Sequence, residues 1–163
     1  MNYIKLSFGI FIILGFSRFI PHPPNFTSLL ALSFYVPAVL GFRYTPALMF
    51  SFVITDYFIG FHNLTFFTWG SVFIIALISK YFVQTIYKRI LGSLVGALIF
   101  FIISNFGVWL NGGYGLDLKG LIQCYYFAIP FFYYSIISTL IFASIFEAIL
   151  KIKYLNKINI YAK

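Results

Sequence analysis

The residues of this chain that could bind a solute are few, because 62% of its 163 residues are hydrophobic and only 9% are charged. Four ionisable side chains interrupt or adjoin long apolar runs: Arg18, His22, Asp56 and His62. Asp56 lies within an apolar segment, where an unpaired carboxylate is costly. We therefore expect Asp56 either to form an ion pair with Arg18 or to face a hydrated cavity.

A rigid turn follows Arg18, since Pro21-His22-Pro23-Pro24 places three prolines in four positions. Proline lacks a backbone N–H and restricts the residue before it, so a helix cannot continue through this stretch. We expect His22 and Asn25 to form the lid of a small-molecule site, with Arg18 at its rim. Two other interpretations stay open: a solvated loop position for His22, and an Arg18 side chain that extends to lipid headgroups.

A third polar group is predicted on a helix. Asn105 and Trp109 are four residues apart, which places them on one helical face. Their amide and indole could hydrogen-bond to and stack on a planar ligand; the alternative is an aromatic belt residue beside a helix-stabilising amide. Asn111 follows in a glycine-rich loop. The candidate substrate-binding residues are Arg18, His22, Asn25, Asp56, His62, Asn105, Trp109 and Asn111.

Signatures of enzymes are missing from the sequence. It contains no Gly-x-Ser-x-Gly, His-Glu-x-x-His, phosphate-binding loop or Cys-x-x-Cys. We therefore expect neither catalytic residues nor a cofactor. The net charge of +8 does not indicate nucleic acid as a partner, because the basic residues stand between apolar runs instead of clustering.

The composition predicts the elements that must position these residues. A mean hydropathy of +0.98 lies outside the range of soluble domains, and a spanning helix needs about 20 apolar residues. We predict an all-α, polytopic membrane protein: one six-transmembrane-helix bundle over residues 1–150 and a basic tail over 151–163. The predicted helices cover residues 3–20, 27–42, 44–61, 64–83, 90–110 and 131–150.

Two prolines are expected to disturb these helices. Pro37 should kink the second helix, because it cannot donate a backbone hydrogen bond. The apolar run 118–150 is too long for one perpendicular span, so Pro130 is expected to divide it into an interfacial piece and a spanning helix. Near the end of that helix, Glu147 is expected to pair with a basic residue of the tail.

The distribution of Lys and Arg predicts the orientation. With the N-terminus inside, only Arg18 and Lys119 of the eleven basic residues fall outside, as the positive-inside rule requires. The nine inside are Lys5, Arg43, Lys80, Lys88, Arg89, Lys151, Lys153, Lys157 and Lys163. We expect a bacterial cytoplasmic (inner) membrane protein with both termini in the cytoplasm. The candidate residues then gather toward the outer face, which favours an outward cavity over a channel.

Four stretches carry a resemblance that covers nearly the whole chain. They are Arg18-x-x-Pro21-His22-Pro23-Pro24-Asn25-Phe26-Thr27, Thr55-Asp56-Tyr57-Phe58-Ile59-Gly60-Phe61-His62, Ser104-Asn105-Phe106-Gly107-Val108-Trp109 and Ala128-Ile129-Pro130-Phe131-Phe132. These resemble an uncharacterised family of small six-helix bacterial membrane proteins. That family is in turn similar to the substrate-binding S components of energy-coupling-factor vitamin transporters.

The resemblance implies an S-component-like fold that captures a substrate in an outward cavity capped by the first loop. It also implies a partner, namely a transmembrane coupling subunit with ATPases. The first helix departs from the S-component pattern, since it has only Gly9 and Gly15 where those proteins show Ala-x-x-x-Ala. The coupling partner is therefore left open.

Three functions are weighed. The leading hypothesis is a substrate-binding or transport protein that takes up a small, planar or vitamin-like molecule. The alternative is a structural or assembly subunit, since Gly92-x-x-x-Gly96 and Ser93-x-x-x-Ala97 would allow a partner helix to approach closely. The third is transition-metal uptake through His22, Asp56 and His62, whose spacing matches no established set of ligands.

Overall fold

The computed structural model describes the backbone of residues 3–161 and the side chains of residues 3–152. Within this range the protein is all-helical and has no strand, as its sequence predicts. The six α-helices are α1 (Tyr3–Phe19), α2 (Leu29–Tyr35), α3 (Thr45–Ile59), α4 (Thr65–Ile78), α5 (Ile86–Leu110) and α6 (Leu118–Tyr161). Three short helical turns join them: η1 (Val36–Leu40), η2 (Phe42–Tyr44) and η3 (Ser79–Phe82).

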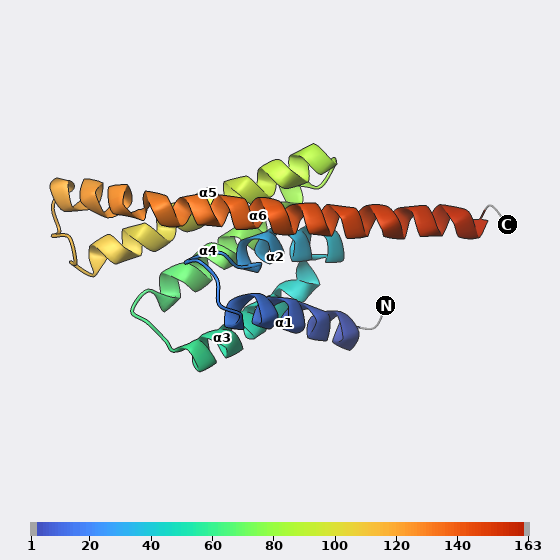
Figure 1. Ribbon diagram of the computed structural model, residues 1–163, viewed down its shortest axis with the longest axis horizontal. Coiled ribbons are helices and arrows are strands. Elements are labelled where there is room, and N and C mark those ends of the chain that lie inside the picture. Colours follow the sequence, from blue (N-terminus) through green and yellow to red (C-terminus); the bar gives the residue numbers. More distant parts are fainter. Residues whose placement is uncertain (1–2, 162–163) are drawn as a thin grey trace.

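Successive helices alternate in direction, so the connections collect at two ends (Figure 1). The connections at 20–28, 60–64 and 111–117 lie at one end, which we call the proline-turn end. The α2–α3 and α4–α5 connections lie at the opposite end, where α1 begins and α6 ends. The α5–α6 hairpin extends past the other helices at the proline-turn end.

The proline turn is fixed by local hydrogen bonds. The Phe26 N–H donates to the Pro23 carbonyl at 3.0 Å, and Asn25 between them has a φ of 62°. Proline followed by a residue with positive φ is the pattern of a type II turn, in which asparagine is one of the tolerated residues. The turn is tied to α1 by a 2.7 Å hydrogen bond between the Ser17 and Ser28 hydroxyls. The proline turn is therefore anchored at its base.

Pro37 and Pro130 affect their helices differently. The α-helical geometry of α2 ends at Tyr35 and passes into the π-helical turn η1, which contains Pro37; the predicted disturbance is confirmed at this position. The predicted division at Pro130 is wrong, because α6 continues through it and on to Tyr161. Contacts with α5 hold α6 on both sides of Pro130. They are the hydrogen bond from the Tyr125 hydroxyl to the Ile102 carbonyl and the Phe101–Phe132 ring contact at 4.5 Å.

The small residues of α5 pack inside the chain. A Cβ atom at Gly92 would lie 2.5 Å from the Phe34 ring, and one at Gly96 would lie 2.9 Å from Ile75. The glycines therefore admit side chains of α2 and α4. The prediction that this face receives a partner protein is wrong, because α2 and α4 already cover it.

Among the residues that the structure describes, three helical segments are long and apolar enough to cross a bilayer. They are Thr65–Phe82, Ile86–Leu110 and Leu118–Ile152, while Leu29–Leu40 is a shorter apolar helix. Large apolar side chains also cover the outside of the bundle, including Phe66, Leu98 and Ile141. Such a surface suits lipid, so the helices indicate a membrane protein.

Candidate functional site

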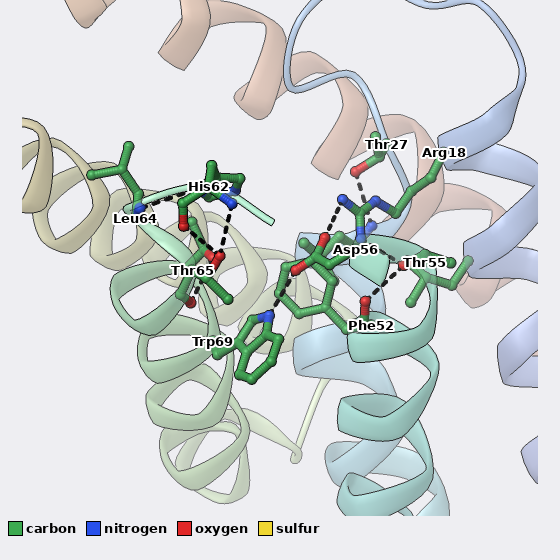
Figure 2. Close-up of polar contacts among 12 residues, drawn as sticks. Arg18, Thr27, Phe52, Thr55, Asp56, His62, Leu64, Thr65 and Trp69 are labelled. Carbon is green, nitrogen blue, oxygen red and sulfur yellow. Dashed lines mark hydrogen bonds and ion pairs between the residues drawn. The ribbon is translucent and has the colours of Figure 1, made fainter. Parts of the chain in front are cut away.

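A buried ion pair lies at the proline-turn end. The Nη2 atom of Arg18 is 2.6 Å from Oδ1 of Asp56, which confirms the predicted pairing. Trp69 donates from Nε1 to the other carboxylate oxygen, Oδ2, at 2.7 Å. Figure 2 shows Arg18 and Trp69 on either side of the carboxylate. Both oxygens of the buried Asp56 side chain are therefore occupied.

Three helix ends bring these groups together. Arg18 lies in the last turn of α1, Asp56 in the last turn of α3, and Trp69 in the second turn of α4. Helices α1 and α3 run parallel, since Tyr3 at the start of α1 stacks on Tyr44 just before α3 at 4.8 Å. Gly60, with a φ of 112°, ends α3 and lets the chain turn toward α4.

Additional contacts orient the guanidinium of Arg18. Its Nη1 atom donates to the Thr55 hydroxyl at 2.6 Å, and its carbon Cζ lies 4.7 Å from the centre of the Phe52 ring. A guanidinium is attracted to the face of an aromatic ring. These contacts fix the planar group at one position in the wall of a cavity.

Two adjoining cavities open beside this ion pair. The first, which we call the ionic cavity, has a volume of about 310 Å³ and is lined by Arg18, Asp56 and Phe52 together with the proline turn. The second, the aromatic cavity, has a volume of about 290 Å³ and is lined by phenylalanines of α5 and α6. Both are lined by Asn25, His62, Thr68, Phe100 and Ser135. They therefore form one continuous site.

Six of the eight predicted residues line this site. Arg18, His22, Asn25, Asp56 and His62 line the ionic cavity, and Asn105 lines the aromatic cavity with Asn25 and His62. Trp109 and Asn111 line neither cavity, and their part in binding stays a prediction.

Trp109 and Asn111 belong to the α5–α6 hairpin, which projects past the other helices (Figure 1). Trp109 lies one turn beyond Asn105 and donates from Nε1 to the Asp117 carbonyl at 3.3 Å. Asn111 caps the end of α5 and is exposed. Both residues therefore belong to the hairpin beyond the cavity, and helical spacing alone does not reveal where the cavity stops.

The hydrogen bonds of the two histidines establish which nitrogen carries a proton. The Leu64 N–H donates to Nδ1 of His62 at 3.2 Å (Figure 2), so the neutral ring holds its proton on Nε2. Nδ1 of His22 lies 2.7 Å from the Pro23 carbonyl oxygen. A carbonyl oxygen only accepts hydrogen bonds, so this Nδ1 is the donor.

The proposed metal set is not assembled. Among the described residues, no three His, Cys, Asp or Glu side chains are grouped so that they could hold a metal ion. The Nδ1 atoms of His22 and His62 bond to backbone groups, and the carboxylate of Asp56 is held by the ion pair with Arg18 and the hydrogen bond from Trp69. The three residues named in the metal-uptake hypothesis are therefore not grouped as metal ligands.

Several site residues were not predicted from the sequence. They are Thr27, Leu29, Leu30, Phe52, Ile59, Leu64, Thr68, Phe100, Phe101, Ser104, Val108, Phe131, Phe132 and Ser135, together with Thr55 and Trp69 behind the ion pair. The position of Thr55 next to Asp56 in the sequence could have indicated that it belongs to the site. Nothing in the sequence distinguishes the phenylalanines that line the cavities, because the chain contains 23 of them.

A second buried ion pair lies at the opposite end. Arg89 holds Glu147 with two parallel bonds, from Nε to Oε1 at 2.6 Å and from Nη2 to Oε2 at 2.7 Å. The Tyr35 hydroxyl also donates to Oε1, at 2.9 Å. Glu147 therefore pairs with Arg89 of α5 and not with Lys151, whereas the tail side chains from residue 153 on, to which the predicted pairing also applied, lie outside the described residues.

The two ion pairs divide the helices into two sets. The Arg18–Asp56–Trp69 group links α1, α3 and α4, whereas the Tyr35–Arg89–Glu147 group links α2, α5 and α6. Both cavities are lined by residues of both sets. The site therefore lies between the two sets, which also pack on one another where Ile75 of α4 meets Gly96 of α5.

Comparison with known proteins gives one match. A family model described as a family of unknown function (DUF6580) matches residues 2–158. No curated protein matches the chain. No solved structure matches it.

Proposed function

The chain belongs to the DUF6580 family of unknown function, and from its site we propose that it binds a small molecule and carries it across the bacterial cytoplasmic membrane. The observation that supports this most strongly is the continuous site between the two sets of helices. Cavities of this size, mainly apolar with a few fixed polar groups, are typical of small-molecule sites. Arg18 and Asp56 supply the fixed charges, and Asn25, His62 and Asn105 supply neutral polar groups.

We propose that all six helices cross the membrane and that the site opens to the outside. Lys5, Arg43, Lys80 and Lys88 belong to α1, η2, η3 and α5 near the opposite end of the bundle. Arg18 and Lys119 lie at the proline-turn end. The positive-inside rule would place the opposite end, with both termini, in the cytoplasm. The anchored turn at 20–28 would then cap the site from outside.

Transport requires the binding site to be accessible first from the outside and then from the cytoplasm. The two sets of helices could move relative to one another without breaking either buried ion pair, since each pair lies within one set. We propose that such a movement releases the ligand inward. The resemblance to S components names a candidate energising partner, a transmembrane coupling subunit with ATPases, which would co-purify with the tagged protein from its native membrane.

The proposed function is tested by identifying any small molecule that co-purifies with the protein. Gently purified wild-type protein should retain a small molecule that mass spectrometry detects in stoichiometric amount. Asn105→Ala should lose it, because Asn105 lines the aromatic cavity. Asn111→Ala is the matched control, since it removes an exposed amide further along the same chain segment. Equal recovery from both variants, or an empty wild-type protein in repeated preparations, would contradict the proposal.

A further inference from the structure

We infer that the ligand is a small aromatic carboxylate whose acid group binds Arg18 and whose ring lies among the phenylalanines of α5 and α6. This inference rests on the proposed binding function and names its substrate class. Three features carry it: free hydrogen-bond donors in the ionic cavity, aromatic rings in the adjoining cavity, and one amide acceptor beside those rings.

The ionic cavity contains donors that the protein leaves free. A guanidinium has five N–H groups, and Arg18 uses one nitrogen toward Asp56 and one toward Thr55. No described residue accepts from its Nε–H, nor from the second hydrogen of each terminal nitrogen. His62 adds its Nε2–H, because its Nδ1 accepts from Leu64. An acceptor on the ligand would take the place of water on these groups.

None of the other described polar groups of the ionic cavity accepts a hydrogen bond from these free donors. Oδ1 of Asp56 forms the ion pair with Nη2 of Arg18, and Oδ2 accepts the hydrogen bond from Trp69. The hydroxyls of Thr68 and Ser135 donate to carbonyls of their own helices. The strongest free donors are thus a guanidinium and an imidazole.

A carboxylate fits these donors best. It offers two oxygens in the plane of the guanidinium, and charge-assisted bonds of this kind are about twice as strong as neutral ones. No second acid lines the cavity, because Asp117 lies in the α5–α6 connection and Glu147 lies at the opposite end. A ligand carboxylate would therefore meet repulsion only from Asp56, whose charge Arg18 and Trp69 already stabilise.

The adjoining cavity fits a flat, apolar body. Phe100, Phe101, Phe131 and Phe132 line it, and the Phe101 and Phe132 rings lie 4.5 Å apart. Phe100 also lines the ionic cavity, so an aromatic ring can extend along it from one cavity into the other. Aromatic rings prefer offset or edge contacts of this kind.

Asn105 would recognise the far side of the ligand. Its Nδ2 donates to the Phe101 carbonyl at 2.7 Å, which leaves Oδ1 without a partner among the described residues. Oδ1 would accept from a ring N–H or a hydroxyl. The inferred class of ligand is thus narrowed to aromatic carboxylates that carry a hydrogen-bond donor on or beside the ring.

The test compares acids with their uncharged amides. The probes are indole-3-acetate against indole-3-acetamide and 4-hydroxybenzoate against 4-hydroxybenzamide, added to the full-length protein in lipid nanodiscs. Affinity is measured by calorimetry and by the shift in melting temperature. We expect at least one acid to bind about tenfold or more tightly than its amide, as a hydrogen bond to a charged group contributes.

Two matched variants separate recognition from stability. Arg18→Lys keeps a charge for Asp56 but removes the free edge of the guanidinium, so the preference for the acid should fall severalfold. Arg89→Lys alters the other buried ion pair and should lower the melting temperature while keeping the preference. An equal loss of preference in both variants would overturn the inference.

The outcomes also separate this inference from the proposed function. Amides that bind as well as acids would overturn the carboxylate assignment, as would failure of every acid to bind. If a neutral molecule nevertheless co-purifies with the protein, the binding function stands and only the ligand class is wrong. If no probe binds and nothing co-purifies, both are wrong.

Discussion

The Arg89–Glu147 pair gives the sharpest prediction about stability. Only 17% of the Arg89 side chain and 9% of the Glu147 side chain are exposed. Glu147→Gln would leave the guanidinium without its counter-charge, and removing one partner of a buried ion pair costs about 3–5 kcal/mol. Arg89 also donates to the Val83 carbonyl at 3.1 Å, which survives the substitution. We therefore expect the lower part of that range, about 3 kcal/mol.

The Tyr35 hydroxyl should contribute separately. Its hydrogen bond to Oε1 of Glu147 is 2.9 Å long, and a hydrogen bond to a charged group contributes about 1.5–3 kcal/mol. Tyr35→Phe should therefore lower the free energy of unfolding by less than Glu147→Gln does. In a Glu147→Gln background the same substitution should cost less, because the charged acceptor is already gone.

The decisive comparison removes both charges. Replacing both partners of a buried pair with apolar residues is often close to neutral. Arg89→Met with Glu147→Leu should therefore cost much less than the sum of the two single substitutions. The free energies are measured by titrating the protein in mixed micelles with a denaturing detergent and monitoring helix content. Single and double variants whose costs simply add would refute the ion pair as the link between α5 and α6.

Three further predictions follow from packing and orientation. Gly96→Leu should destabilise the protein by about 1–3 kcal/mol through overpacking against Ile75, whereas Gly70→Leu should be tolerated because a Cβ there meets nothing within 4 Å; equal melting temperatures would contradict this packing. Pro130→Ala should keep or raise the melting temperature, since α6 is continuous there and gains a backbone donor; a marked loss of stability would argue against that continuity. A cysteine at position 22 should react with a membrane-impermeant thiol reagent in intact spheroplasts, and labelling only after lysis would reverse the proposed orientation.

The sequence was sufficient for the class of fold and for most helix positions. Predicted helices 3–20, 44–61 and 64–83 match α1, α3 and α4 with η3 to within two residues at each end. The lengths of apolar runs and the positions of prolines are local properties of the sequence, so they can be identified without knowledge of the packing. The helix predicted at 90–110 begins four residues earlier, at Ile86, because Thr85 accepts a hydrogen bond from the Lys88 N–H and caps it.

The ion pair at the candidate site could also be predicted. A carboxylate inside an apolar helix needs a cation, and Arg18 was one of only two basic residues expected at the outer end. Membership of the site was harder to predict. Asn105 and Trp109 share a helical face, yet the cavity ends between them.

Only the tertiary structure decided the remaining partners. Glu147 pairs with Arg89, which is 58 residues away in the chain, and Asp56 receives the indole of Trp69 from α4. Which of the many phenylalanines line the cavity depends on how α5 and α6 meet. Local sequence determines where helices begin and end, because that follows from hydrophobicity and backbone hydrogen bonding. Which side chains meet across them follows from packing, and packing is a property of the whole chain.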